Sequence, residues 1–139
     1  MKYYYDWMID VKQARLEQRR ENFSRAINLL SKQSEKEVID DENIAATLHF
    51  FEMAFELAWK LLKDYLEIQG VIVNSPREVI KKSFQLEYID DGVLWLEMLD
   101  ARNSISHMYE ESMAKELFLC IKERFIFPLL KVGELKCRD

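Results

Sequence analysis

One segment limits the possible folds more than any other part of the chain. Residues 43–70, "NIAATLHFFEMAFELAWKLLKDYLEIQG", contain no proline and have a glycine only at the end. Apolar residues recur in it at the spacing of one helical face: Ile44, Leu48, Phe51, Phe55, Ala58, Leu62 and Leu66. Gly70 suits the left-handed position that commonly follows a helix. With only three glycines and two prolines in 139 residues, the chain also lacks the turn residues of a β-sandwich. The sequence therefore predicts an all-α fold.

The same spacing predicts a first helix over residues 6–30. Its apolar positions are Trp7, Val11, Ala14, Phe23, Ala26, Ile27 and Leu30. A polar connection, residues 31–43, should follow. In "NSPREVIKKSFQ" (74–85), Ser75 is placed as an N-cap, Pro76 as the first helical residue, and Glu78 completes a capping box. These signals predict a short third helix.

Two more helices complete the expected fold. Asp90 or Asp91 should cap a fourth helix, and Ser112 should cap a last helix that runs to about residue 127. Pro128 lacks the amide proton that a helix interior needs, so we expect a kink or break near Ile126 and a short tail beyond it. We predict a single domain, residues 1–139, built as an up-and-down bundle of four or five helices.

The second helix also suggests a dimer. Its aromatic residues exceed what one stripe of a monomer would hide: Phe50, Phe51, Phe55, Trp59 and Tyr65. We therefore expect part of this surface to meet a second subunit, in a homodimer or a higher oligomer.

Charge and cysteine content narrow the classes of function. The net charge of −5 argues against non-specific coating of nucleic acid, which depends on Lys and Arg, but leaves room for a small basic site. Cys120 and Cys137 form no CxxC pair, and Cys120 is expected in the core. Two unpaired thiols and a start without a continuous apolar stretch fit the cytoplasm. No window approaches the roughly 18 apolar residues of a membrane span.

The segment "ARNSISHMYEE" (101–111) holds the candidate site residues Arg102, Asn103, His107 and Tyr109. On a regular helix Arg102 and His107 would point about 140° apart. They can reach one phosphate only if the helix loosens between them or if two subunits share the site. The intervening Asn and Ser residues are weak helix formers, which makes loosening plausible. The alternative is that these are incidental polar residues at a helix end.

The residue types favour RNA cleavage without a metal or other cofactor. The sequence has no Gly-rich phosphate loop, HExxH or GxSxG. The Glu-x-x-His pairs of di-metal bundles are also missing, since Ser104 and Ala46 stand three residues before the two histidines. His107 could act as acid or base, Arg102 could bind the phosphate oxygens, and Asn103 could orient either group. In a symmetric dimer two copies of His107 could serve the two proton transfers.

Two other features have simpler explanations. His49 lies in an apolar run and is interpreted as a packed or partly exposed structural residue. Glu52 and Glu56 share a helix face with Lys60 and Lys63, and Glu56 with Lys60 is a favourable i,i+4 pair. The simpler interpretation is a solvated charged stripe. The alternative is a carboxylate that contacts Arg102 or a partner enzyme.

"RNSISHMY" matches the RxxxxHxY signature of the HEPN superfamily. Three segments also resemble, in order and spacing, the HepT-like proteins known as nucleotidyltransferase substrate-binding proteins: "FFEMAFELAWKLLKDYLEIQG", "SPREVIKKSFQLEYID" and "WLEMLDARNSISHMYEE". The resemblance extends from about Phe23 to Pro128.

The resemblance implies a dimerising helical bundle whose motifs line a shared cleft. HepT-like toxins cut RNA without metal, and their motif maps onto Arg102, Asn103 and His107. It also implies that a partner, a minimal nucleotidyltransferase antitoxin, transfers AMP to Tyr109 and blocks the site. Two alternatives stay open at this point. One is a non-catalytic subunit that binds a nucleotide or substrate for a separately encoded nucleotidyltransferase, and the other is a purely structural dimer.

Overall fold

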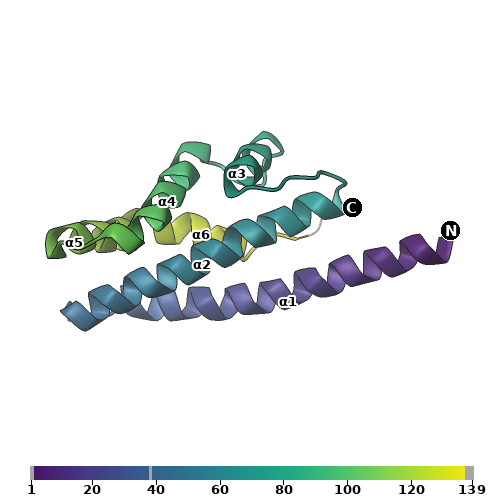
Figure 1. The fold of residues 1–139 in the computed structure, drawn as a ribbon. Coiled ribbons are helices and arrows are strands. Elements are labelled where there is room, and N and C mark those ends of the chain that lie inside the picture. Colours follow the sequence, from purple (N-terminus) through teal and green to yellow (C-terminus); the bar gives the residue numbers. More distant parts are fainter. Residues whose placement is uncertain (1, 38, 137–139) are drawn as a thin grey trace.

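The computed structural model describes residues 2–37 and 39–136, which form helices joined by short connections (Figure 1). The elements in chain order are α1 (Lys2–Ser34), α2 (Asp41–Ile68), α3 (Pro76–Gln85), α4 (Gly92–Ser104), the 3₁₀ turn η1 (Ile105–His107), α5 (Glu111–Cys120), the π-helical turn η2 (Ile121–Phe125) and α6 (Ile126–Val132). No strand occurs among the described residues. The predicted all-α bundle is confirmed.

Helix α2 is the centre of the bundle. It forms an antiparallel hairpin with α1 and also packs against α3, α4, α5 and α6 (Figure 1). Three of its aromatic rings are covered by other segments of the same chain. Phe51 stacks on Phe125, Phe55 packs on Trp95, and Tyr65 stacks on Tyr88, with ring centroids 5.6, 6.0 and 6.2 Å apart.

This packing corrects the expectation that the aromatic residues of α2 provide a subunit interface. Phe51, Phe55, Trp59 and Tyr65 are all buried within the chain, and only Phe50 is partly exposed. The number of aromatic residues in α2 was misleading, because α4, η2 and the loop before α4 each contribute an aromatic ring that covers one of them.

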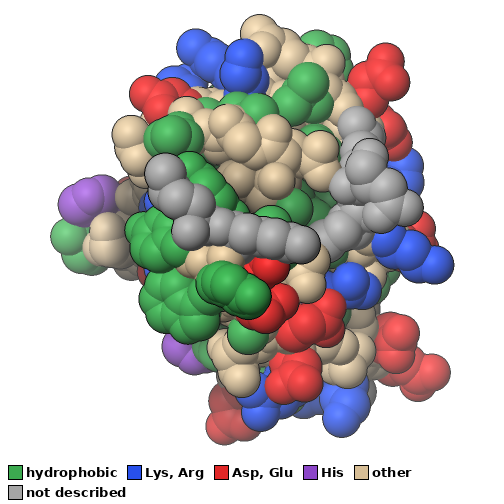
Figure 2. All heavy atoms as spheres, turned by 90° about the vertical axis from the view of Figure 1, so that its right-hand side faces the viewer, with side chains coloured by type: hydrophobic (Ala, Val, Ile, Leu, Met, Phe, Trp, Pro, Cys, Tyr) green, Lys and Arg blue, Asp and Glu red, His purple; other side chains and the backbone are tan. Residues whose placement is uncertain are grey.

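Helix α1 differs between its two halves. From Leu16 onward it packs on α2 through buried residues that include Leu16, Phe23 and Leu30. Its N-terminal end extends beyond the end of α2 (Figure 1), and the predicted apolar positions Trp7 and Val11, which precede Leu16, are exposed. Figure 2 views this end of the molecule and shows hydrophobic side chains open to solvent beside acidic and basic ones. The expected apolar face of residues 6–30 is therefore buried only in part.

Local signals set most of the helix starts. Ser75 Oγ and Asp91 Oδ1 accept hydrogen bonds from the backbone N–H groups of Glu78 (3.2 Å) and Leu94 (3.0 Å), as predicted for N-caps. Gly70 has a φ of +83°, also as predicted. The connection between the first two helices is shorter than expected, because α1 continues to Ser34 and Asp40 caps α2 through the N–H of Asn43 (2.7 Å).

One prediction about the last helix is corrected and another is confirmed. Ser112 is not its cap: α5 begins at Glu111 and no side chain caps it. The break expected near Ile126 is present: the π-helical turn η2 interrupts the α-helix, with the N–H of Ile126 bonded to the carbonyl of Ile121, and the short helix α6 runs from Ile126 to Val132. Pro128 thus falls in the first turn of α6, where a missing N–H costs least.

Cys120 is partly buried and packs against the core, whereas Cys137 lies outside the described residues. Within residues 2–37 and 39–136, no helix combines the length and the apolar character that crossing a bilayer requires.

Candidate functional site

Helix α4 carries the motif arginine toward α2. Trp95 and Leu99 are buried at one-turn spacing, and Trp95 packs on Phe55 of α2. Arg102 follows Trp95 by seven residues and Leu99 by three, so it lies on the same face of α4. The apolar contacts that dock α4 therefore also direct the Arg102 side chain at α2.

The helix loosens between Arg102 and His107, after Ser104, as the weak helix formers of this segment made plausible. The Ser104 hydroxyl donates to the carbonyl of Asp100 (2.8 Å), α4 ends there, and η1 follows. Ile105 and Met108 are half-buried against the core and anchor this turn. His107 and Tyr109 stay exposed, Tyr109 with 87% of its surface accessible. The turn therefore presents the motif's imidazole and phenol to solvent.

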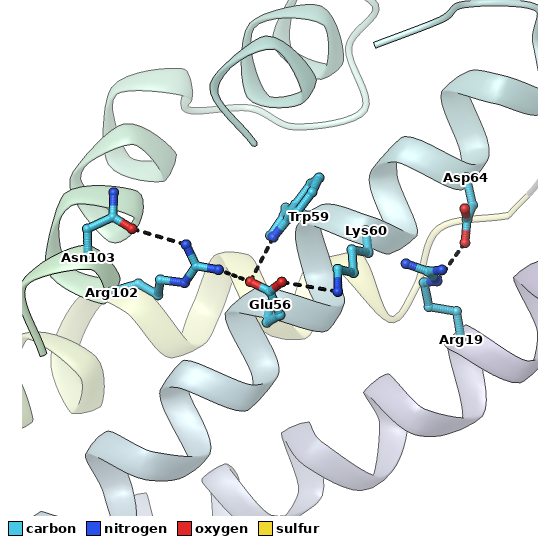
Figure 3. A network of polar contacts seen from close by, with 7 residues as sticks. All are labelled: Arg19, Glu56, Trp59, Lys60, Asp64, Arg102 and Asn103. Atoms are coloured by element: carbon cyan, nitrogen blue, oxygen red, sulfur yellow. Dashed lines mark hydrogen bonds and ion pairs between the residues drawn. The ribbon is translucent and has the colours of Figure 1, made fainter. Parts of the chain in front are cut away.

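A polar network surrounds Arg102 (Figure 3). Its Nη1 donates to Asn103 Oδ1 (3.0 Å), and its Nη2 donates to Glu56 Oε2 on α2. The same Glu56 oxygen accepts from Trp59 Nε1 (3.0 Å), and the other oxygen, Oε1, pairs with Lys60 Nζ (3.1 Å). One carboxylate thus binds three donors, from two helices.

The network keeps Glu56 ionised. Partial burial alone would raise the pKa of this carboxyl group, but the hydrogen bonds from Trp59 and Lys60 and the charges of Arg102 and Lys60 outweigh burial, so the pKa is lowered. The solvated-stripe interpretation therefore fails for Glu56, and the alternative, a carboxylate that contacts Arg102, is correct. Glu52, one turn earlier, is exposed and fits the solvated stripe.

The predicted site residues fall into two groups. Arg102 and Asn103 are joined by a hydrogen bond, whereas His107 and Tyr109 make no side-chain hydrogen bond or ion pair with the described part of the chain. A convergence of Arg102 and His107 on one phosphate thus stays a prediction. His49 is exposed on α2 with its ring 5.5 Å from that of Phe50, and both histidines lie at the surface (Figure 2).

The sequence interpretation missed Trp59 as a member of the network. A signal for it exists, because Trp59 follows Glu56 by three residues and i,i+3 neighbours meet on a helix surface. Among the residues that the structure describes, no three His, Cys, Asp or Glu side chains are grouped closely enough to hold a metal ion.

Known proteins that resemble this chain were found at three levels: a family profile, a curated protein sequence and a solved structure. The sequence profile of the family described as "Nucleotidyltransferase substrate binding protein like" matches residues 18–134. A protein of Haemophilus influenzae named "Probable ribonuclease HepT" is 22% identical over 107 residues, 73% of each chain. A protein of Thermus thermophilus with a known crystal structure superposes with a TM-score of 0.73 at 27% identity, covering 79% of this chain and 94% of that one.

The family match includes the whole of α2, α3, α4 and the RxxxxHxY motif, and leaves out only the first seventeen and the last five residues. The chain belongs to the nucleotidyltransferase substrate binding protein like family, the HepT-like branch of the HEPN superfamily.

Proposed function

We propose that this chain is the toxin of a toxin–antitoxin pair, a metal-independent endoribonuclease that acts in the cytoplasm as a homodimer. Its antitoxin is a minimal nucleotidyltransferase that silences it by AMP transfer to Tyr109. The observation that carries the proposal is the end of α4. There Arg102 is held by Glu56 and Asn103, five residues before an exposed His107.

The residues suit the cleavage chemistry. His107 as base takes the proton of a 2'-hydroxyl, whose oxygen attacks the adjacent phosphorus while the bond to the 5'-oxygen breaks. An acid, the His107 of a second subunit, protonates the leaving 5'-oxygen. The products are a 2',3'-cyclic phosphate and a 5'-hydroxyl. Arg102 stabilises the charge on the pentavalent intermediate, which a guanidinium does well because its planar donors match phosphate oxygens.

A dimer supports this mechanism because the cleavage needs both a base and an acid. The His107 side chain has no hydrogen-bond or ion-pair partner among the described residues of its own chain and is open to a facing motif. We expect RNA cleavage per chain to fall when the protein is diluted below its dimer dissociation constant. The fraction of dimer at each concentration is measured by analytical ultracentrifugation. Constant activity per chain in a monomer would contradict a shared site.

Cleavage itself is tested with the two histidines as a matched pair. His107→Ala should lower the rate of RNA cleavage about 10²–10⁴-fold, the usual contribution of a general acid or base. His49→Ala, which removes the other exposed histidine, should leave the rate unchanged. Equal cleavage by the wild type and His107→Ala would end the nuclease proposal.

The proposal predicts a minimal nucleotidyltransferase in a neighbouring reading frame, and silencing is tested with that enzyme. Tyr109 is a suitable acceptor because its hydroxyl is open to solvent. Incubation with that enzyme and ATP should add one adenylyl group to the wild type and to Tyr4→Phe, a control at another exposed tyrosine, and none to Tyr109→Phe. Modification that persists in Tyr109→Phe would identify another acceptor.

A second candidate function is a non-catalytic subunit that binds a nucleotide or substrate for a separate nucleotidyltransferase. The description of the matched family favours it. In that case Arg102 binds a phosphate of the ligand, and Arg102→Ala weakens nucleotide binding without any RNA turnover to lose. Isothermal titration with AMP and ATP, beside the cleavage assay, separates the two functions.

A further inference from the structure

Two positively charged side chains from different helices bind the same carboxylate, that of Glu56. Glu56 Oε2 accepts from Arg102 of α4, and Glu56 Oε1 pairs with Lys60 of α2 at 3.1 Å (Figure 3). Because the two oxygens belong to one side chain, the ammonium and the guanidinium lie close to each other. Without Glu56 between them, two like charges at this separation would repel.

Both cations keep donors for a further ligand. Arg102 has five N–H groups, of which one is donated to Asn103 and one to Glu56, so three remain. Lys60 has three, of which one is directed at Glu56, so two remain. The side chains are partly exposed, 25% for Arg102 and 40% for Lys60, so a ligand can reach them from solvent.

The charges leave a positive balance. Lys60 and Arg102 contribute two positive charges and Glu56 one negative charge, because the donors around Glu56 keep it ionised. The net charge of +1 matches the single negative charge of an RNA phosphodiester. This local balance is opposite in sign to the net charge of −5 of the whole chain.

A second pair on the same helix shows what an ordinary surface pair looks like. Lys63 and Glu67 are also four residues apart, but their charged atoms are 3.8 Å apart, and no other helix of the described chain contributes a hydrogen bond or ion pair to them. Both side chains are partly exposed, 30% for Lys63 and 26% for Glu67, and an isolated pair of this kind contributes little. Lys60 differs because its carboxylate partner also binds the motif arginine.

We propose that Glu56 gathers Lys60 and Arg102 into a two-cation subsite for one phosphate of the RNA. Lys60 is then a further RNA-binding residue that lies outside the RxxxxHxY motif, and Glu56 is the positioning residue for both cations. The inference rests on the proposed function for the identity of its ligand, and its test measures RNA binding separately from the cleavage step.

The test measures binding with an RNA that cannot be cut. A short single-stranded RNA methylated at every 2'-hydroxyl lacks the attacking nucleophile, so its affinity is measured apart from cleavage. Fluorescence anisotropy over a series of KCl concentrations gives the slope of log K against log salt, which falls by about 0.7 for each lost phosphate contact on a single strand. Lys60→Gln should lower the slope by about that amount and weaken binding several-fold. Lys60→Arg should restore both.

Lys63→Gln is the matched control and should bind as the wild type does, at every salt concentration. A Lys60→Gln variant whose slope and affinity equal those of Lys63→Gln would overturn the inference. If the wild type binds the methylated RNA but does not cut the unmodified one, the nuclease proposal fails while the slope still tests Lys60. If the wild type cuts RNA but Lys60→Gln keeps the full salt slope, the nuclease proposal stands and the two-cation subsite is overturned. A wild type that binds no RNA ends both.

Discussion

Helix α2 carries two carboxylates that each receive an arginine from another helix, and the two sites differ in almost every physical respect. Glu56 meets Arg102 of α4, together with Trp59 and Lys60. Asp64, two turns further along α2, meets Arg19 of α1, with Nε 2.8 Å from Oδ2 but without hydrogen-bond alignment (Figure 3). Glu56 is about one-third exposed, whereas Asp64 is buried.

The two carboxyl groups are shifted in opposite directions. Burial raises the pKa of Asp64, and the charge of Arg19 only partly compensates for it. Burial acts in the same sense on Glu56, but several hydrogen bonds and two cations lower its pKa overall. The ionised form is thus costly at Asp64 and favoured at Glu56.

The comparison separates a structural ion pair from a functional one. The Arg19–Asp64 pair lies between α1 and α2 and presents little surface to a ligand, because its carboxylate is buried and its arginine is 24% exposed. The Glu56 network is open to solvent and includes a motif residue with donors to spare. The following predictions test this division of roles.

The largest expected difference is in catalysis. Arg102→Ala should lower RNA cleavage about 10²–10³-fold, because it removes a donor to the charge that develops on the phosphate. Arg19→Ala should cleave RNA as the wild type does under conditions where it is folded. Both rates are measured under single-turnover conditions at saturating protein. Equal losses in the two variants would mean that the two arginines do not differ in role.

For the free energy of unfolding, the arginine with the larger expected effect is Arg19 and not Arg102. Arg19→Ala leaves a buried carboxylate without its cation and should lower the free energy of unfolding by about 3 kcal/mol, the lower end for broken buried pairs. Arg102→Ala should cost about 1 kcal/mol or less, since Glu56 keeps Trp59 and Lys60 and is partly hydrated. Urea unfolding at pH 7 measures both. Arg25→Ala, an exposed position on α1, is the control and should stay within about 0.5 kcal/mol of the wild type. A stable Arg19→Ala would show that Asp64 needs no partner.

Much of this comparison could not be predicted from the sequence, although the helices could. The apolar spacing of residues 43–70 and the caps at Ser75 and Asp91 are local signals, and each predicted an element that the structure contains. The Glu56–Arg102 contact joins residues 46 positions apart and depends on how α4 docks on α2. From the sequence, a contact between Arg102 and a carboxylate of Glu52 or Glu56 was only an alternative to a solvated stripe, because the spacing of residues along α2 does not show how α4 docks on it.

Two other features escaped prediction for related reasons. The N-terminal half of α1 has helical apolar spacing, yet burial requires a partner of equal length, and α1 has 33 residues against 28 in α2. Pro128 predicted a break near Ile126, but not that the break would be the π-helical turn η2, in which Ile121 and Phe125 are buried. Spacing predicts which residues can share a face, but the neighbouring elements decide whether that face is covered.

The smallest and most specific difference concerns pH. The folded-state pKa of Asp64 lies above its ordinary value of 3.8, so its ionisation costs stability, and the cost appears as pH rises through the folded pKa. The folded-state pKa of Glu56 lies below its ordinary value of 4.5, so its charge contributes stability above that value, and the contribution is lost as pH falls through the folded pKa.

Neutral variants should therefore diverge in opposite directions. Relative to the wild type, Asp64→Asn should become more stable and Glu56→Gln less stable as pH rises from the acid range to 7. The measurement is the free energy of unfolding in urea at half-unit pH steps for the three proteins. The difference between the variants should shrink toward the acid end of the range, because protonated Asp64 resembles asparagine and the contribution of Glu56 is lost as pH falls through its lowered folded pKa. The comparison uses only the change of the unfolding free energy with pH. A loss of stability that the new amide side chain of either variant causes equally at every pH therefore does not affect the result. If the unfolding free energies of the two variants change with pH in parallel, the two carboxylates have the same electrostatic environment. The distinction between the two sites would then rest on exposure alone.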